Sequence, residues 1–246
     1  MTWEKEAKEI NLRKILSKKQ GGDKAIKKHH EKGRKTLRER IDYILDKDTF
    51  DEIGETAGFA HYDSEGELED FTPSNFLLGF GKLANRSIII GGEDFTLKGG
   101  SPNPAGLRKS IYTEELALKY KIPLVRLHEG GGGSVTGSGG SAKKPKIPGG
   151  EPVYSKNRFQ TLAKTLGIIP VASAALGPVA GLPAARLVAS HFSVMTKKSQ
   201  VLIAGPEVVK RALGIDMSKE ELGGPDIHLR SGVVDNLADD EDDALN

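Results

Sequence analysis

Two glycine-rich turns are the parts of this sequence that are best suited to chemistry. The first, residues 130–133, follows the apolar run 124–127, and the second, residues 177–181, follows the apolar run 171–176. Glycine has no side chain, so the N–H groups of such turns can approach a ligand closely. Pro183 suits the first turn of a helix, whose N-terminus adds further unpaired N–H groups. Two such turns side by side would polarise a carbonyl oxygen as an oxyanion hole, although tight packing alone would also require glycine.

Side chains offer no clear alternative catalyst. Ser134 follows a glycine, but Thr136 stands where the nucleophile elbow of a serine hydrolase requires glycine. The six histidines show no H-E-x-x-H or similar spacing, so we predict no metal site. Residues 79–84 imitate a dinucleotide fingerprint, but a strand follows where a helix is needed, which predicts a hairpin. The absence of cysteine excludes disulfides, thiol nucleophiles and zinc ribbons.

The elements that must position the two turns alternate between strands and helices after residue 100. The predicted strands are 123–127, 168–174, 192–195 and 201–204, and the predicted helices are 102–119, 155–166, 183–190 and 206–213. Earlier in the chain, 76–82 and 87–90 are predicted strands. Near the C-terminus, the acidic run 239–243 is expected to be a solvated surface or the start of a helix that the chain does not complete. This alternation predicts an α/β protein with a largely parallel sheet that is covered by helices.

The N-terminal region differs in composition from the rest of the chain. The first forty residues carry fourteen Lys or Arg and six Asp or Glu. We predict polar helices that are interrupted at residues 21–22, with a second helix over 24–45. They form either an arm that binds phosphate or docks on a partner, or a solvated amphipathic extension. We therefore divide the chain into a basic helical extension, residues 1–45, and a folded domain, residues 46–246.

The overall composition narrows the possible partners. Thirty-six Lys and Arg against thirty-four Asp and Glu leave a formal charge of +2, so nothing favours nucleic acid or an anionic membrane as a partner. No apolar run approaches the roughly 20 residues that a membrane-spanning helix needs. The charged start of the chain does not fit a secretory signal. We expect a cytoplasmic protein.

A series of motifs runs in order from about residue 31 to the C-terminus. They are G-R-K-T-L-R-E-R-I at 33–41, D-F-T-L-K-G-G-S at 94–101, G-P-V-A-G at 177–181, S-H-F-S-V-M at 190–195, A-G-P-E-V-V at 204–209, K-E-E-L-G-G at 219–224 and S-G-V-V at 231–234. With residues 129–135 in the place of a D-S-G-G-A-R turn, the series resembles the carboxyltransferase subunits of biotin-dependent acyl-CoA carboxylases. The resemblance implies a crotonase-like fold, a spiral of ββα units, behind the helical extension.

The resemblance also implies an activity and a set of site residues. Such enzymes move a carboxyl group from carboxybiotin to the α-carbon of a short acyl-CoA, and backbone N–H groups hold the thioester enolate. The residues implied for this hole are Gly132, Gly133, Gly181 and Leu182. The residues implied for substrate contacts are Gly100, Lys109, Gly131 and Ala180. Lys109 would lie near the CoA phosphates, unless it is an ordinary surface lysine. Released biotin can take the α-proton, so no protein base is required.

Departures from the family pattern qualify this assignment. Leu182-Pro183 stands where Gly-Ala is usual, and because Pro183 has no N–H, the donors of the second turn narrow to Gly181 and Leu182. Ser134 and the glycine before it replace an Ala-Arg pair, which affects the choice of substrate.

The length of the sequence corresponds to one of the two related halves of a family subunit, the N-terminal one, and the other half would supply the hole for biotin. The partners implied are this carboxyl-terminal half, a biotin carboxyl carrier protein that holds the biotin, a biotin carboxylase and further copies of the chain. A biotin-dependent decarboxylase subunit and a non-catalytic CoA-binding or assembly module are the alternative interpretations.

Overall fold

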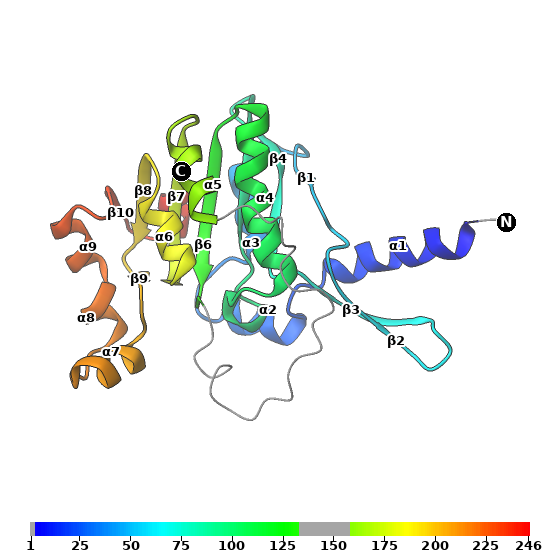
Figure 1. Ribbon diagram of the computed structural model, residues 1–246, viewed down its shortest axis with the longest axis horizontal. Helices are drawn as coiled ribbons and strands as arrows, with labels where there is room; N and C mark the ends of the chain where they lie inside the picture. Colours follow the sequence, from blue (N-terminus) through cyan, green and yellow to red (C-terminus); the bar gives the residue numbers. More distant parts are fainter. Residues whose placement is uncertain (1–2, 133–157) are drawn as a thin grey trace.

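A single large sheet forms the centre of the structure, which is a computed structural model that describes residues 3–132 and 158–246 (Figure 1). The strand order is β1-β4-β5-β6-β7-β8-β10, and β9 pairs with β7 outside this path. The strands are β1 (Asp51–Glu52), β4 (Phe76–Leu83), β5 (Arg86–Glu93), β6 (Leu124–Gly130), β7 (Val171–Ala180), β8 (Phe192–Thr196), β9 (Gln200–Leu202) and β10 (Asn236–Ala238). Strands β5, β6, β7, β8 and β10 are parallel to one another, as the sequence predicts.

Helices connect the parallel strands. They are α4 (Pro104–Tyr120) between β5 and β6, α5 (Arg158–Leu166) between β6 and β7, α6 (Leu182–Val188) between β7 and β8, and α7 (Pro206–Leu213) after β9. Each lies within a few residues of its predicted range. The short elements α8 (Lys219–Gly223), α9 (Pro225–Ser231) and β10 are not predicted from the sequence. The acidic C-terminal run does complete a helix, α10 (Glu241–Leu245), because Asp240 caps it and Leu245 is buried in the core.

The dinucleotide-like glycines lie in a hairpin, as predicted. Strand β4 pairs antiparallel with β5, and the turn between them is formed by Ala84 and Asn85, whose φ angles are 48° and 63°. The Asp46 carboxylate accepts hydrogen bonds from both turn N–H groups, at 3.1 and 2.7 Å, and so stabilises this left-handed conformation. No helix follows the glycines, so this segment cannot cradle a dinucleotide.

The sheet buries both of its faces. Along β5, Ile88 and Ile90 point into a core cluster with α3 (Leu37–Ile44) and α10, whereas Ile89 points into a second cluster with α4. This alternation follows from the two-residue period of a strand. Ile88, Ile89 and Ile90 form a continuous apolar run in the sequence, because helices cover both faces of this part of the sheet.

The predicted helix over 24–45 is wrong, because two helices occupy this range. They are α2 (Asp23–His30) and α3, and the chain between them passes through Gly33, which has a φ of 69°. Thr36 then starts α3 with a capping box, in which its side chain accepts the Glu39 N–H and the Glu39 carboxylate accepts the Thr36 N–H. A new helix therefore begins where a continuation was expected.

The expected division after residue 45 does not coincide with a break in the core. Leu37, Ile41 and Leu45 belong to the same apolar cluster as Ile90 and Leu127 of the central sheet. The part that extends away from the sheet is smaller. It consists of α1 (Glu4–Ser17) and the hairpin of β2 (Gly58–Tyr62) and β3 (Leu68–Pro73), which lie together at one end of the molecule (Figure 1).

The protruding part is held by polar contacts on a mostly exposed surface. Glu9 of α1 accepts a hydrogen bond from the Tyr62 hydroxyl at 2.8 Å, and Arg13 contacts the same hydroxyl. Across the described ranges 3–132 and 158–246, no helix is both long and apolar enough to cross a membrane.

If α3 is part of the core, shortening Ile41 should destabilise the whole protein. We expect Ile41→Ala to lower the free energy of unfolding by about 2–5 kcal/mol, because this side chain is completely buried. Asp42→Ala, on the exposed side of the same helix, should change it by less than about 0.5 kcal/mol. Urea denaturation of both variants measures the difference, and equal small effects would show that α3 is only attached to the surface.

Candidate functional site

The two glycine turns meet at one edge of the sheet. Strands β6 and β7 are parallel neighbours, so their carboxyl ends lie side by side. Residues 177–180 of the predicted second turn belong to β7, which pairs with β9 over 178–180, so the chain turns only at Gly181. A Cβ atom on Gly132 would lie 2.7 Å from the Ala180 carbonyl oxygen and 3.3 Å from the Gly181 nitrogen. Gly132 also has a φ of 66°, which favours glycine. Four of the predicted site residues, Gly131, Gly132, Ala180 and Gly181, are therefore close together, whereas Gly133 lies outside the described residues.

The backbone donors of these turns are not all available. The Gly181 N–H donates to the Leu202 carbonyl at 2.9 Å, as part of the pairing between β7 and β9. The Gly131 N–H donates to the Gly99 carbonyl, also at 2.9 Å. The expectation that Gly181 donates to a ligand therefore needs correction, because this N–H already holds β9 in the sheet. Sequence patterns cannot reveal this pairing, since β9 lies about twenty residues further along the chain.

Two predicted donors keep their N–H groups unused within the described part of the chain. No described residue accepts a hydrogen bond from Gly132 or from Leu182. Leu182 is the first residue of α6, where an N–H has no partner inside the helix. The next residue, Pro183, has no N–H, so the second turn offers Leu182 alone at this point.

Gly100 packs against the end of β6, where the first turn begins. It belongs to a short 3-10 helix, η1 (Lys98–Gly100), and a Cβ atom on it would lie 2.6 Å from the Glu129 carbonyl oxygen. Its φ of 67° likewise requires glycine. Since the carbonyl of Gly99 also accepts the Gly131 N–H, η1 holds the end of β6 in place. Contact of Gly100 with a substrate stays a prediction.

Lys109 is not the surface lysine that the sequence leaves open as an alternative. Its side chain is buried, with its Nζ atom 3.3 Å from the Gly54 carbonyl oxygen and 3.8 Å from a Glu52 carboxylate oxygen. Burial lowers the pKa of Lys109 to about 8, although the charge of Glu52 opposes this change. Because its ammonium group is engaged inside the protein, this position does not fit a contact with the CoA phosphates.

A buried ionic cluster lies behind the turns, on the side of the sheet that faces α4 and α6. Glu114 of α4 accepts hydrogen bonds from Arg126 of β6 at 3.0 Å and from Arg186 of α6 at 2.8 Å. Beside it, the His128 ring contacts the Glu93 carboxylate at 3.0 Å. Burial alone would raise the pKa of Glu93, but His128 and Arg186 outweigh it and lower that pKa. Sequence reasoning missed this cluster because its members come from four different elements.

A large cleft begins at the second turn. It has a volume of about 1080 Å³ and a mainly apolar lining from α5, α6, β9, α8 and the end of α9. Gly181 and Leu182 form part of its wall, together with exposed apolar side chains such as Phe159, Val188 and Ile203. An apolar cleft with a few polar backbone groups at one end is typical of a small-molecule site.

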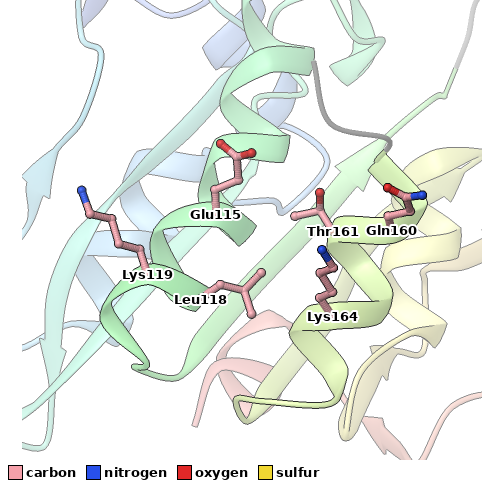
Figure 2. Close-up of a pocket in the computed structure, with 6 residues that line it drawn as sticks. All are labelled: Glu115, Leu118, Lys119, Gln160, Thr161 and Lys164. Carbon is pink, nitrogen blue, oxygen red and sulfur yellow. The ribbon is translucent and has the colours of Figure 1, made fainter. Parts of the chain in front are cut away.

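A second groove is polar and lies away from the turns. Figure 2 shows it between α4, which carries Glu115 and Lys119, and α5, which carries Gln160, Thr161 and Lys164. Its volume is about 390 Å³, and neither glycine turn lines it. Among the described residues, no group of three or more His, Asp or Glu side chains is arranged to hold a metal ion.

Comparisons with known proteins agree on one family. The sequence profile of the carboxyl transferase domain matches residues 28–246. The propionyl-CoA carboxylase beta chain of Saccharopolyspora erythraea is 34% identical over 92% of this chain and 40% of its own length. The methylmalonyl-CoA decarboxylase subunit alpha of Veillonella parvula is 29% identical over 92% of this chain and 43% of its own length.

The same likeness holds for three-dimensional structure. The transcarboxylase 12S crystal structure with bound methylmalonyl-coenzyme A superposes with a TM-score of 0.78 and 26% identity, over all of this chain and 46% of that one. The predicted crotonase-like α/β fold is therefore confirmed. The chain spans less than half the length of each of these relatives.

The buried position of Lys109 predicts a specific dependence of stability on pH. Its pKa is about 8 in the folded chain and near 10.5 when unfolded, so within this interval the unfolded chain holds a proton that the folded chain has lost. Stability should therefore rise with pH from about 8 towards 10.5. We expect Lys109→Met to remove this rise, and urea denaturation across the interval measures it. The exposed Lys82→Met is the control, and an unchanged rise in Lys109→Met would contradict the assignment.

Proposed function

The chain belongs to the carboxyl transferase domain family, and on that premise we propose that it is the acyl-CoA-binding half of a biotin-dependent carboxyltransferase. One observation carries the proposal: the N–H groups of Gly132 and Leu182, which no described residue accepts, come from two turns that touch at one edge of the sheet. Amides fixed in this way suit an oxygen that gains negative charge, because they need no reorganisation during the reaction.

The proposed chemistry follows from these two donors. The thioester carbonyl oxygen of a short acyl-CoA would accept hydrogen bonds from the Gly132 and Leu182 amides. Removal of a proton from the α-carbon then gives an enolate whose charge the same amides stabilise. Carboxybiotin, brought by a separate carrier protein, would supply the carboxyl group when bound, and the ureido nitrogen that is freed by loss of this group would accept the α-proton. The described site needs no side chain as a base.

The apolar cleft supports the choice of substrate and of partner. Its wall begins at Leu182, so an acyl-CoA whose thioester meets this amide would run along the cleft. Ile203 in the cleft is 92% exposed and lies among other apolar side chains, and exposed apolar surface of this kind marks an interaction site. We propose that a carboxyl-terminal half, on the same or another chain, covers this surface and brings the hole for biotin. A biotin carboxylase, further copies of this chain and a cytoplasmic location remain predictions.

A decarboxylase subunit is the second candidate. The Veillonella parvula relative is named for methylmalonyl-CoA decarboxylation, and it is nearly as similar to this chain as the carboxylase relative. The same two amides would stabilise the enolate that is formed when a carboxyl group leaves. The direction of the reaction therefore depends on the partner proteins. A non-catalytic CoA-binding module would bind acyl-CoA but would not require these two N–H groups.

We expect the chain alone to bind propionyl-CoA and not free biotin. It should also prefer propionyl-CoA to S-propyl-CoA, a thioether that lacks the carbonyl oxygen, since each neutral hydrogen bond is worth roughly twofold to tenfold in affinity. Isothermal titration calorimetry with the three ligands tests this. Binding of biotin without binding of either CoA compound would contradict the assignment of this half.

The N–H of Leu182 can be removed with little disturbance, because proline is tolerated at the first position of a helix. Leu182→Pro should lower the preference for propionyl-CoA over S-propyl-CoA by roughly twofold to tenfold, because one of the two hydrogen bonds is lost, whereas Leu182→Ala should keep it. Both variants lose the leucine side chain, and only the first loses the N–H. In an assembled enzyme, we expect Leu182→Pro to lower kcat by about 10²- to 10³-fold relative to Leu182→Ala. Equal behaviour of the two variants would favour a non-catalytic module.

A further inference from the structure

Glu129 is a buried carboxylate at the start of the first glycine turn. It lies in β6 next to Gly130, and no part of its side chain is exposed. Arg34 approaches one carboxylate oxygen at 2.8 Å, and Arg40 and His29 approach the other at 2.6 and 3.4 Å. Burial by itself would raise the pKa of Glu129, but the neighbouring His29, Arg40 and Arg34 side chains lower it. The carboxylate is therefore ionised inside the protein.

Both the side chain and the backbone of Glu129 are tightly enclosed. A Cβ atom on Gly177 of β7 would lie 2.5 Å from the Glu129 carboxylate, and one on Gly100 would lie 2.6 Å from its carbonyl oxygen. Glycine at these two positions leaves the space that Glu129 occupies. Gly177 belongs to the strand that leads to the second turn, so this one residue contacts the supports of both turns.

An ordinary role in stability does not explain this arrangement well. Burying a carboxylate and two guanidinium groups carries a large desolvation penalty, and apolar residues of similar size often stabilise a protein as much or more. A buried ion pair does fix direction, because arginine holds a carboxylate through oriented N–H groups. The chain leaves Glu129 and reaches Gly132 three residues later, through Gly130, which pairs with Val179 of β7, and Gly131, whose N–H donates to Gly99.

We propose that Glu129, held by Arg34 and Arg40, is a positioning residue that sets the direction in which Gly132 presents its N–H. This inference rests on the proposed function, since it concerns the same pair of backbone donors. It also gives the N-terminal segment a role in the site, because the side chains around Glu129 come from α2, α3 and the chain between them. The family motif at 33–41 contains both arginines.

Glu129→Gln keeps the shape of the side chain and removes its charge. We expect the preference for propionyl-CoA over S-propyl-CoA to fall by roughly twofold to tenfold, the contribution of the Gly132 hydrogen bond, while the contribution of Leu182 stays. Glu52→Gln is the matched control. The Glu52 carboxylate is also largely buried and accepts a hydrogen bond from Arg38 at 2.8 Å, but it lies in β1, at the edge of the sheet and away from both turns. We expect this variant to lose thermal stability and to keep the preference.

Arg34→Met is a milder change, and it tests the proposal even if the Glu129→Gln variant does not fold. The Arg34 side chain is 20% exposed, so Arg34→Met should fold and should weaken the preference, whereas Arg34→Lys should restore most of it. A merely structural role of Glu129 would lower the melting temperature and the affinity for both ligands equally, without changing their ratio.

The possible results separate this inference from the proposed function. A parent chain that binds both ligands equally would overturn the proposed function. A parent chain with a clear preference that Glu129→Gln and Arg34→Met retain in full would overturn the positioning role alone.

Discussion

The close approach of Gly132 to Ala180 is the constraint on which the site depends. A Cβ atom on Gly132 would lie within 2.7 Å of the Ala180 carbonyl oxygen, so any other residue would push the two turns apart. The parallel pairing of β6 and β7 brings the turns to the same edge, and glycine lets them touch. The proposed oxyanion hole depends on that contact, because only adjacent turns can direct two amides to one oxygen atom.

The surroundings of β6 explain how this contact is kept. Its carboxyl end lies between two buried ionic clusters on opposite faces of the sheet. Arg126 and His128 point towards α4 and α6, and Glu129 points towards α2 and α3. Alternation along the strand sends neighbouring charges to opposite faces. Ionic groups on both faces fix the rotation and the position of the strand end more narrowly than apolar packing would, because their partners must meet in specific directions.

The sequence predicts local features of this protein well and long-range pairings poorly. The alternation of elements, the hairpin at residues 79–84 and the two turns all follow from patterns within about twenty residues. The break between α2 and α3 was missed, although Gly33 and the cap at Thr36 mark it in the sequence. The burial of Lys109 and the use of the Gly181 N–H could not be predicted, since each depends on a partner that comes close only after folding.

The two turns share a pattern in how the described residues use their N–H groups. In each turn one N–H donates to another part of the fold, and no described residue accepts the next one. Gly131 is bonded to Gly99 and is followed by Gly132, and Gly181 is bonded to Leu202 and is followed by Leu182. Because consecutive peptide planes share one Cα atom, a donor that follows an anchored amide can turn only about the φ and ψ bonds between the two planes. The bonded N–H groups of Gly131 and Gly181 therefore help to hold the N–H groups of Gly132 and Leu182 in place. A turn in which no amide is bonded to the rest of the fold would position its donors less firmly.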